Sequence, residues 1–368
     1  MLHFPAAMRV VRSRLMHKTR FRLSLILFCL TVVSSSGGEV FGQEPSDWTP
    51  AAGTDGEQKQ GGELNPPPRE QAKSSLLATL GMRVGMAGAA LAARSVGGRF
   101  AQIGADWTEA FPAHRIVGNV YYVGSKGLGS YLVTTPEGHI LINSSLEASV
   151  PLIRESVEKL GFRFGDVKIL LISHAHWDHC AGSAWVKELT GAKYMVMDAD
   201  VPVIESGGKE DFQYGSSPDN LYKPTQVDRV LHDGDEVKLG GVVLVAHKTP
   251  GHTKGCTTWT MKTVDAGKTY DVVIVGSPNV NPGYKLVNNE KYRQIALDYE
   301  QMFRVLKSLP CDVFLGAHGD YYGMAEKFAR AKQGAANAFV DPDGYKSYVA
   351  DREQAFRAEW KKQEKGKL

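Results

Sequence analysis

The chain has 368 residues, of which 43% are hydrophobic and 23% are charged, an ordinary composition for a soluble globular protein of one or two domains. The formal net charge is +3, but residues 1–42 hold six basic residues and one acidic residue, so the remainder carries −2. No excess of positive charge is left to neutralise phosphates, which argues against a nucleic-acid partner.

Residues 1–42 predict a secretory signal peptide. Basic residues from Arg9 to Arg22 precede the apolar run LSLILFCLTVV (23–33), and mostly small residues follow it up to Gly42. The alternative is a membrane anchor, but eleven residues fall short of the roughly 20 that a spanning helix needs. We therefore expect a cleaved signal, a secreted or periplasmic location, and no stable membrane insertion of the mature protein.

Residues 43–104 predict a disordered linker followed by a short N-terminal helix. Segment 43–75 is rich in Pro, Gly, Glu and Gln and has too little apolar content to form a core. Segment 76–98 is apolar, but Arg83 and Arg94 interrupt it, which indicates a loosely packed helix and not a membrane span. The folded domain is expected over residues 105–368.

Strand and helix patterns are intermixed from residue 105 onward. Runs of β-branched and aromatic residues predict strands within 119–125, 130–143, 167–173, 193–199, 242–250, 257–264, 271–277 and 311–318. Apolar residues on one face predict helices within 149–162 and 290–309, and Asp341 before Pro342 predicts the start of a last helix. With hairpin turns expected at PEG (136–138) and HDGD (232–235), the pattern indicates an α/β fold with two sheets, not one doubly wound sheet.

The stretch HAHWDH follows the apolar strand at 167–173 and holds four candidate metal ligands in six positions: His174, His176, Asp178 and His179. His174 and His176 are two residues apart, so on an extended segment both side chains point to the same side. Four such ligands cannot all reach one ion comfortably, and the pattern therefore favours a pair of ions. Imidazole nitrogens and carboxylate oxygens are suitable ligands for Zn²⁺.

Two further histidines lie at the ends of other predicted strands. His252 is on the Pro/Gly turn TPGHTKG (249–255), and His318 ends the apolar run CDVFLGAH (311–318). Functional side chains usually lie on loops at strand ends, so we expect both histidines to complete the ligand set. The alternative, a polar cluster held only by hydrogen bonds, requires six such positions to coincide without a metal.

The spacing HxHxDH, with a distant GH and a later AH, resembles the metallo-β-lactamase superfamily over residues 105–368. The runs 105–133 and TPGHTKGCTTWT (249–260) are similar to its subclass B3. The resemblance implies an αββα sandwich of two mixed β-sheets flanked by helices, with two Zn²⁺ ions per chain. It places the first ion on His174, His176 and His252, and the second on Asp178, His179 and His318.

The resemblance also implies a function, which is zinc-dependent hydrolysis of the β-lactam amide bond by a metal-activated hydroxide, conferring β-lactam resistance. Asp178 would orient the hydroxide and relay a proton, and Tyr284 would donate to the developing oxyanion. Ser277 and Asn279 would contact the substrate carboxylate. We expect a monomer whose partner is a small-molecule β-lactam substrate.

Ser277 separates this function from its alternatives. Lactone and thioester hydrolases of this fold, which are glyoxalase-like, usually carry a metal-bridging Asp after a Gly at this strand end, and so do its iron-dependent oxygenases. Here the pair is Gly276-Ser277. The substitution favours β-lactam hydrolysis, while a lactone or thioester hydrolase, an iron-dependent oxygenase and a non-catalytic metal-binding module are the alternatives.

Many relatives in this family have a cysteine at the position of Gly276, which can pair with the position of Cys256. Relatives also often have one in the C-terminal helix to pair with the position of Cys311. Both partners are missing here, so Cys256 and Cys311 are expected to be free and buried. Segment SGGKEDF (206–212) is expected to be a surface loop near the cleft, with a substrate-facing rim as its alternative.

Overall fold

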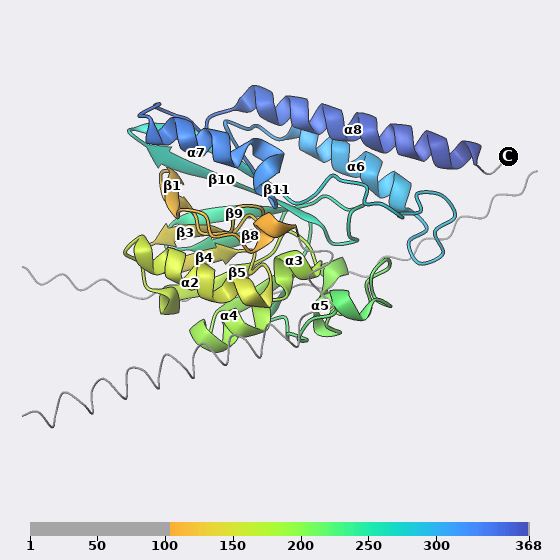
Figure 1. Ribbon diagram of the computed structural model, residues 1–368, viewed down its shortest axis with the longest axis horizontal. Coiled ribbons are helices and arrows are strands. Elements are labelled where there is room, and N and C mark those ends of the chain that lie inside the picture. The colour runs from red at the N-terminus through yellow and green to blue at the C-terminus, as the bar shows by residue number, and fades with distance from the viewer. Residues whose placement is uncertain (1–103, 367–368) are drawn as a thin grey trace, which may run out of the picture. The chain divides into compact units, whose positions relative to one another are not determined.

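The computed structural model describes residues 104–366, so the predicted signal peptide, linker and N-terminal helix lie outside the described residues, apart from Gly104. The described part contains two β-sheets (Figure 1). The first has the strand order β1 (His114–Val117), β2 (Val120–Tyr122), β3 (Tyr131–Thr135), β4 (Gly138–Ile142), β5 (Val167–Leu171), β6 (Lys193–Met197), β7 (Arg229–Leu231). The second has the order β12 (Val313–Gly316), β11 (Lys268–Val275), β10 (Thr257–Asp265), β9 (Val242–Lys248), β8 (Glu236–Leu239).

Both sheets are mixed. Strands β1 to β4 pair antiparallel, whereas β4 to β7 pair parallel. In the second sheet, β8 to β11 pair antiparallel and β12 joins β11 in parallel. The helices are α2 (Val150–Lys159), α3 (Trp177–Cys180), α4 (Ser183–Thr190), α5 (Val201–Glu205), α6 (Ile295–Ser308), α7 (Met324–Lys332) and α8 (Pro342–Lys365). Short 3-10 helices are η2 (Ala105–Trp107), η3 (Glu147–Ser149), η4 (Phe164–Asp166), η5 (Asp198–Asp200), η6 (Pro218–Asn220) and η7 (Gly319–Tyr322).

The alternation of side chains along β4 and β5 explains the layering. Ile140 and Ile142 of β4 point into the core between the sheets, whereas Leu141 points to the opposite face, where it packs with α2 and α4. Successive strand residues face opposite sides, so a strand that is apolar on both faces must be covered on both. Helices α6 and α8 cover the second sheet, and the layers therefore run helix, sheet, sheet, helix (Figure 1).

The structure confirms the predicted αββα sandwich and most of the predicted elements. Asp341 caps α8 as predicted, because its side chain accepts a hydrogen bond from the amide of Gly344. The helix expected within 290–309 begins only at Ile295. No described helix is both long and apolar enough to cross a membrane.

Two expectations are corrected by the structure. The HDGD turn (232–235) is not a hairpin, because it leads from β7 of the first sheet to β8 of the second. Cys256 is free and buried as predicted, but Cys311 is free and only partly buried, since it precedes β12 at the edge of the second sheet.

Candidate metal centre

The segment that follows β5 is hydrogen-bonded to residues at or next to the ends of strands of both sheets, just before it reaches the histidines. The Ser173 amide donates to the Asn143 side-chain oxygen at 2.8 Å, and the Ser173 carbonyl accepts from the Thr257 amide at 2.7 Å. Asn143 has a φ of 66°, in the left-handed region that asparagine tolerates better than most residues. Residues 177–180 then form α3, one helical turn that brings Asp178 and His179 back toward His174.

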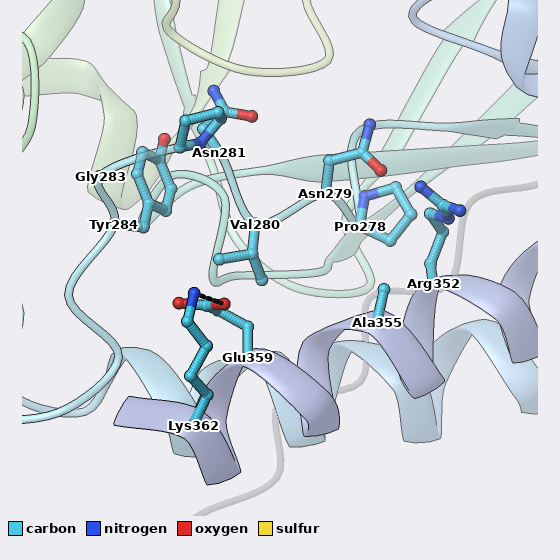
Figure 2. A pocket seen from close by; sticks show the side chains of 11 residues that line it. Pro278, Asn279, Val280, Asn281, Gly283, Tyr284, Arg352, Ala355, Glu359 and Lys362 are labelled. Atoms are coloured by element: carbon cyan, nitrogen blue, oxygen red, sulfur yellow. Dashed lines mark hydrogen bonds and ion pairs between the residues drawn. The ribbon is translucent and has the colours of Figure 1, made fainter. Parts of the chain in front are cut away.

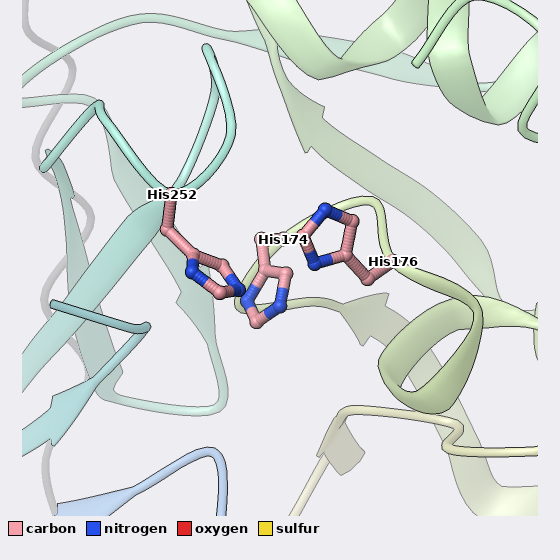
Figure 3. Close-up of side chains that lie close together, drawn as sticks. All are labelled: His174, His176 and His252. Atoms are coloured by element: carbon pink, nitrogen blue, oxygen red, sulfur yellow. The ribbon is translucent and has the colours of Figure 1, made fainter. Parts of the chain in front are cut away.

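One group of candidate ligands consists of His174, His176 and His252. All three are buried, and one nitrogen from each lies within 4.8 Å of the others. The ring centroids are 4.6–4.8 Å apart. Figure 3 shows the three imidazoles converging from two separate loops. The structure thus brings together the three residues predicted for the first ion.

A second group lies beside the first. Ligand atoms of His174, Asp178 and His179 also lie within 4.8 Å of one another. His179 Nε2 is 3.1 Å, and His318 Nε2 is 3.5 Å, from Oδ2 of Asp178. The three residues predicted for the second ion therefore meet at one carboxylate, and His174 is close enough to belong to either group.

The hydrogen bonds of the imidazoles fit a metal centre. His252 Nδ1 is 2.8 Å from the Asn279 carbonyl, and His174 Nδ1 is 3.2 Å from the Ser173 hydroxyl. Nε2 of His174 and Nδ1 of His179 are buried without a hydrogen-bond partner. Buried polar atoms rarely lack a partner, and metal-binding imidazoles commonly hydrogen-bond through the nitrogen that does not bind the ion. The residues present thus fit a cation between them.

The charge states of the ligands also fit. Burial, followed by the neighbouring imidazoles, lowers the pKa of His174 and His252, and it lowers the pKa of His318 to about 4. These histidines are therefore neutral at pH 7, as ligands must be. Burial alone would raise the pKa of Asp178, but the imidazoles of His179 and His318 bring it well below its usual range. His174, His252 and His318 therefore present neutral imidazoles, and Asp178 presents an ionised carboxylate.

Asp211 is part of the site although its segment was expected to be a surface loop. It is 5% exposed, and its Oδ2 lies 3.6 Å from Nε2 of His176. Its Oδ1 accepts from the amides of Gln213 and Tyr214 at 2.8 and 2.5 Å. Burial alone would lower the pKa of His176, but the hydrogen bond and the charge of Asp211 outweigh burial, so the pKa is raised. No motif surrounds Asp211, so the sequence offered no signal for this contact.

Asp200 is a second residue that sequence reasoning missed. It is 1% exposed and accepts three hydrogen bonds: from the Ala175 amide at 2.9 Å, the Thr253 hydroxyl at 2.8 Å and the Gly255 amide at 2.8 Å. Ala175 lies between His174 and His176, whereas the other two donors, Thr253 and Gly255, follow His252 in the chain. One buried carboxylate therefore joins the two loops that carry the first group of ligands.

The predicted substrate-contacting residues differ in their exposure to the cleft. A cavity of about 390 Å³ opens over the ligands, and Asn279 lines it. Ser277 is buried, with its hydroxyl 3.1 Å from that of Tyr321, and Tyr284 is 2% exposed and donates to the His252 carbonyl at 2.9 Å. The other lining residues are mostly aromatic or polar: Trp107, His176, Trp177, Asp178, Tyr214, Asn220, His252, Asn281, His318, Asp320 and Tyr321.

Comparisons with known proteins agree with this geometry. The family model described as the metallo-beta-lactamase superfamily matches residues 130–266. The FEZ-1 metallo-beta-lactamase from Legionella gormanii is 56% identical, with a TM-score of 0.69, over 70% of this chain and 98% of that enzyme. BJP-1, a subclass B3 metallo-beta-lactamase of Bradyrhizobium japonicum, is 34% identical, with a TM-score of 0.68, over 72% of this chain and 99% of that enzyme.

Curated relatives match over shorter stretches. A hydroxyacylglutathione hydrolase of Hyphomonas neptunium is 29% identical over 126 residues, which are 34% of this chain and 40% of that enzyme. The chain covers from about a third to about three fifths of the length of three other curated relatives. The FEZ-1 match, in contrast, covers nearly all of the enzyme. The chain therefore belongs to the metallo-β-lactamase superfamily, and it resembles the subclass B3 enzymes within it.

Proposed function

We propose that this chain is an exported enzyme that binds two Zn²⁺ ions and hydrolyses the amide bond of β-lactams, conferring resistance to them. The convergence of five histidines and Asp178 supports the metal assignment. Identity of 56% along nearly the whole of a β-lactamase supports the substrate. Export follows from the signal peptide predicted in residues 1–42, which lie outside the described residues.

The observation that carries the proposal is the residue at the end of β11. Ser277 places a neutral, buried hydroxyl where lactone and thioester hydrolases of this fold usually have a bridging carboxylate. Its hydroxyl is engaged with Tyr321 and not with the imidazoles. The ligand set therefore contains one carboxylate, that of Asp178, as expected for β-lactam hydrolysis.

Zn²⁺ bound at this site would supply a Lewis acid and lower the pKa of a bound water to about 7. The Asp178 carboxylate stays ionised, so it can accept a hydrogen bond from the attacking water and orient it. Asn279 lies at the cleft surface, where its amide can donate to a substrate carboxylate. The hydroxyl of Tyr284 holds the His252 carbonyl, and donation to the substrate oxyanion would require it to turn toward the cleft.

A thioester or lactone hydrolase is the second candidate, because a hydroxyacylglutathione hydrolase is among the relatives. The two candidates share the metal centre and differ in substrate. Ser277 weighs against the second candidate, since it provides no bridging carboxylate.

The test is hydrolysis of a carbapenem and a cephalosporin by purified protein, with and without a chelator, with metal content assayed on the same sample. We expect chelator-sensitive turnover with about two zinc ions per chain. His252→Ala should lower kcat/KM by roughly 100-fold or more. His247→Ala is the matched control, since His247 lies on β9 and contacts Thr260 instead of the ligands.

Two results would contradict the proposal. Bound zinc with thioester or lactone hydrolysis but no turnover of either β-lactam would establish the second candidate. A single iron per chain without any hydrolysis would direct attention to oxygen chemistry.

A further inference from the structure

The loop from Pro278 to Tyr284 has a cavity on each of its two faces. The metal cleft lies on one face, where Asn279 and Asn281 line it. On the other face, a second cavity of about 650 Å³ separates the loop from α8 (Figure 2). This volume is typical of small-molecule sites, which span about 300–1,000 Å³. We call this second cavity the α8 pocket.

Arg352 of α8 presents an unpaired guanidinium to the α8 pocket. It makes no hydrogen bond or ion pair with any described residue, and its Nε is buried without a partner. The group stacks over the Tyr348 ring at 5.9 Å, and Asp320 influences it only at longer range. Arg357 on the same helix, in contrast, pairs with Glu353 at 2.8 Å. A guanidinium offers a planar fork of donors that matches a carboxylate.

The remaining lining indicates an amphipathic ligand. Lys362 adds a second positive charge, which Glu359, also in the lining, offsets through a bond of 3.0 Å. The pair is largely exposed to solvent, so a ligand carboxylate can compete with Glu359 for Lys362. Pro278, Val280 and Ala355 supply apolar surface between the two basic side chains (Figure 2). A small organic carboxylate with an apolar tail satisfies both kinds of lining.

The α8 pocket is connected to the metal cleft through a stack of aromatic rings. Tyr348, under the Arg352 guanidinium, stacks on Tyr321 with centroids 5.2 Å apart and planes at 29°. Tyr321 lines the metal cleft, and its hydroxyl accepts from Nδ2 of Asn279 at 2.9 Å. A ligand that moves Arg352 therefore acts on a side chain that faces the substrate.

The loop is also fastened to α8 beyond the pocket. Gln363 accepts from the Leu286 amide at 2.7 Å and donates to the Tyr284 carbonyl at 2.8 Å. Tyr284 in turn holds the His252 carbonyl. A shift of the 278–284 loop relative to α8 would therefore be transmitted through Tyr284 to the loop that carries His252.

We propose that the α8 pocket binds a small organic carboxylate through Arg352 and Lys362, and that binding alters turnover by displacing the 278–284 loop. The binding part stands independently of the enzymatic reaction. The coupling part rests on the proposed function, because it requires a substrate whose hydrolysis can be followed.

Octanoate is the probe, with octanol as the uncharged analogue and inorganic phosphate as the anion without a tail. Titration calorimetry on the zinc-loaded protein measures binding, and β-lactam hydrolysis at several octanoate concentrations measures coupling. Arg352→Gln removes the fork, and Arg304→Gln is the matched control because Arg304 is exposed on α6 away from both cavities. Thermal unfolding of both variants checks that they are folded.

We expect saturable binding of one octanoate, weakened roughly tenfold or more by Arg352→Gln and less than about twofold by Arg304→Gln. Octanol and phosphate should bind more weakly than octanoate, and inhibition or activation should be non-competitive with substrate. Absence of binding, equal binding of octanol, equal binding of phosphate, or insensitivity to Arg352→Gln would each overturn the site. Competition with substrate would assign octanoate to the metal cleft instead, and binding without any change in turnover would overturn the coupling. If the proposed function is wrong, the result is different: octanoate still binds, but no β-lactam is hydrolysed with or without it.

Discussion

Replacing Asp200 by alanine is expected to destabilise the fold and loosen the metal centre together. The carboxylate is buried, and it accepts from the Ala175 amide, the Thr253 hydroxyl and the Gly255 amide at 2.8–2.9 Å. Alanine removes all three acceptor contacts at once. The donors lie on the two ligand loops, so the Asp200 carboxylate links these loops directly.

The magnitude follows from the number of donors. Each buried donor left without a partner costs about 1–3 kcal/mol, and allowing for relaxation we expect roughly 3–6 kcal/mol in total. For a domain of this size that is a fall in Tm of roughly 6–24 °C. Asp200→Asn keeps one acceptor oxygen and turns an NH₂ group toward the remaining donor, so it should cost only about 1–2 kcal/mol.

Urea unfolding in the presence of chelator measures the free energy of unfolding without a contribution from bound metal. Zinc titration of the same variants should give an affinity about 10–100-fold weaker for Asp200→Ala, since the ligands lose their support. A change below about 1 kcal/mol for alanine, or an asparagine variant as unstable as the alanine variant, would refute the hydrogen-bond account.

The pH dependence provides an independent check on Asp200. Burial raises its pKa from 3.8 to about 6, although the donors from Thr253, Gly255 and Ala175 oppose the shift. The folded state therefore keeps the proton at pH values where the unfolded state has lost it. The stability advantage of the wild type over Asp200→Asn is thus full below about pH 4 and falls as pH rises through about 6. An advantage that rises with pH would contradict the burial argument.

Two further substitutions test the site and its surroundings. Asp211→Ala removes the carboxylate beside one imidazole and should weaken zinc binding about 10–100-fold by competition titration, whereas the exposed neighbour Glu210→Ala should not. Gly276→Ala should destabilise the protein by about 1–3 kcal/mol in urea, because its Cβ would lie 2.7 Å from Sγ of Cys256. Gly165→Ala meets no atom within 4 Å and serves as the control; equal losses for both glycines would contradict the packing argument.

The fold was predictable because its signals are local. In β4 and β5 both faces are apolar, and the turn at 136–138 and the cap at Asp341 depend on neighbouring residues. The HDGD turn was misjudged because a hairpin and a crossing between sheets use the same turn residues. Which sheet a strand joins is decided by distant partners that the local pattern does not encode.

The residues of the candidate site likewise fall into those that the sequence predicts and those that it does not. The six candidate ligands stand in the spaced motifs HxHxDH, GH and AH, so the sequence predicts them as a set. Asp200 acts through hydrogen bonds to residues 25–55 positions away, such as Ala175 and Gly255, and Asp211 acts through its contact with His176, so no spacing identifies either carboxylate. Tyr284 was found by its resemblance to a family position, but its burial and its bond to His252 were not evident from the sequence.

The pKa values of the two buried carboxylates Asp178 and Asp200 are shifted in opposite directions, which indicates different roles. Burial raises the pKa of both, yet the imidazoles around Asp178 reverse the shift, whereas Asp200 meets mainly neutral donors. Asp178 thus suits a cation, whereas we expect Asp200 to hold the loops whether or not a metal is bound. We therefore expect the amides of Ala175 and Gly255 to remain protected from hydrogen exchange after chelation. Exchange at both amides becoming as fast as in unfolded chain would mean that the metal, and not Asp200, holds the two loops together.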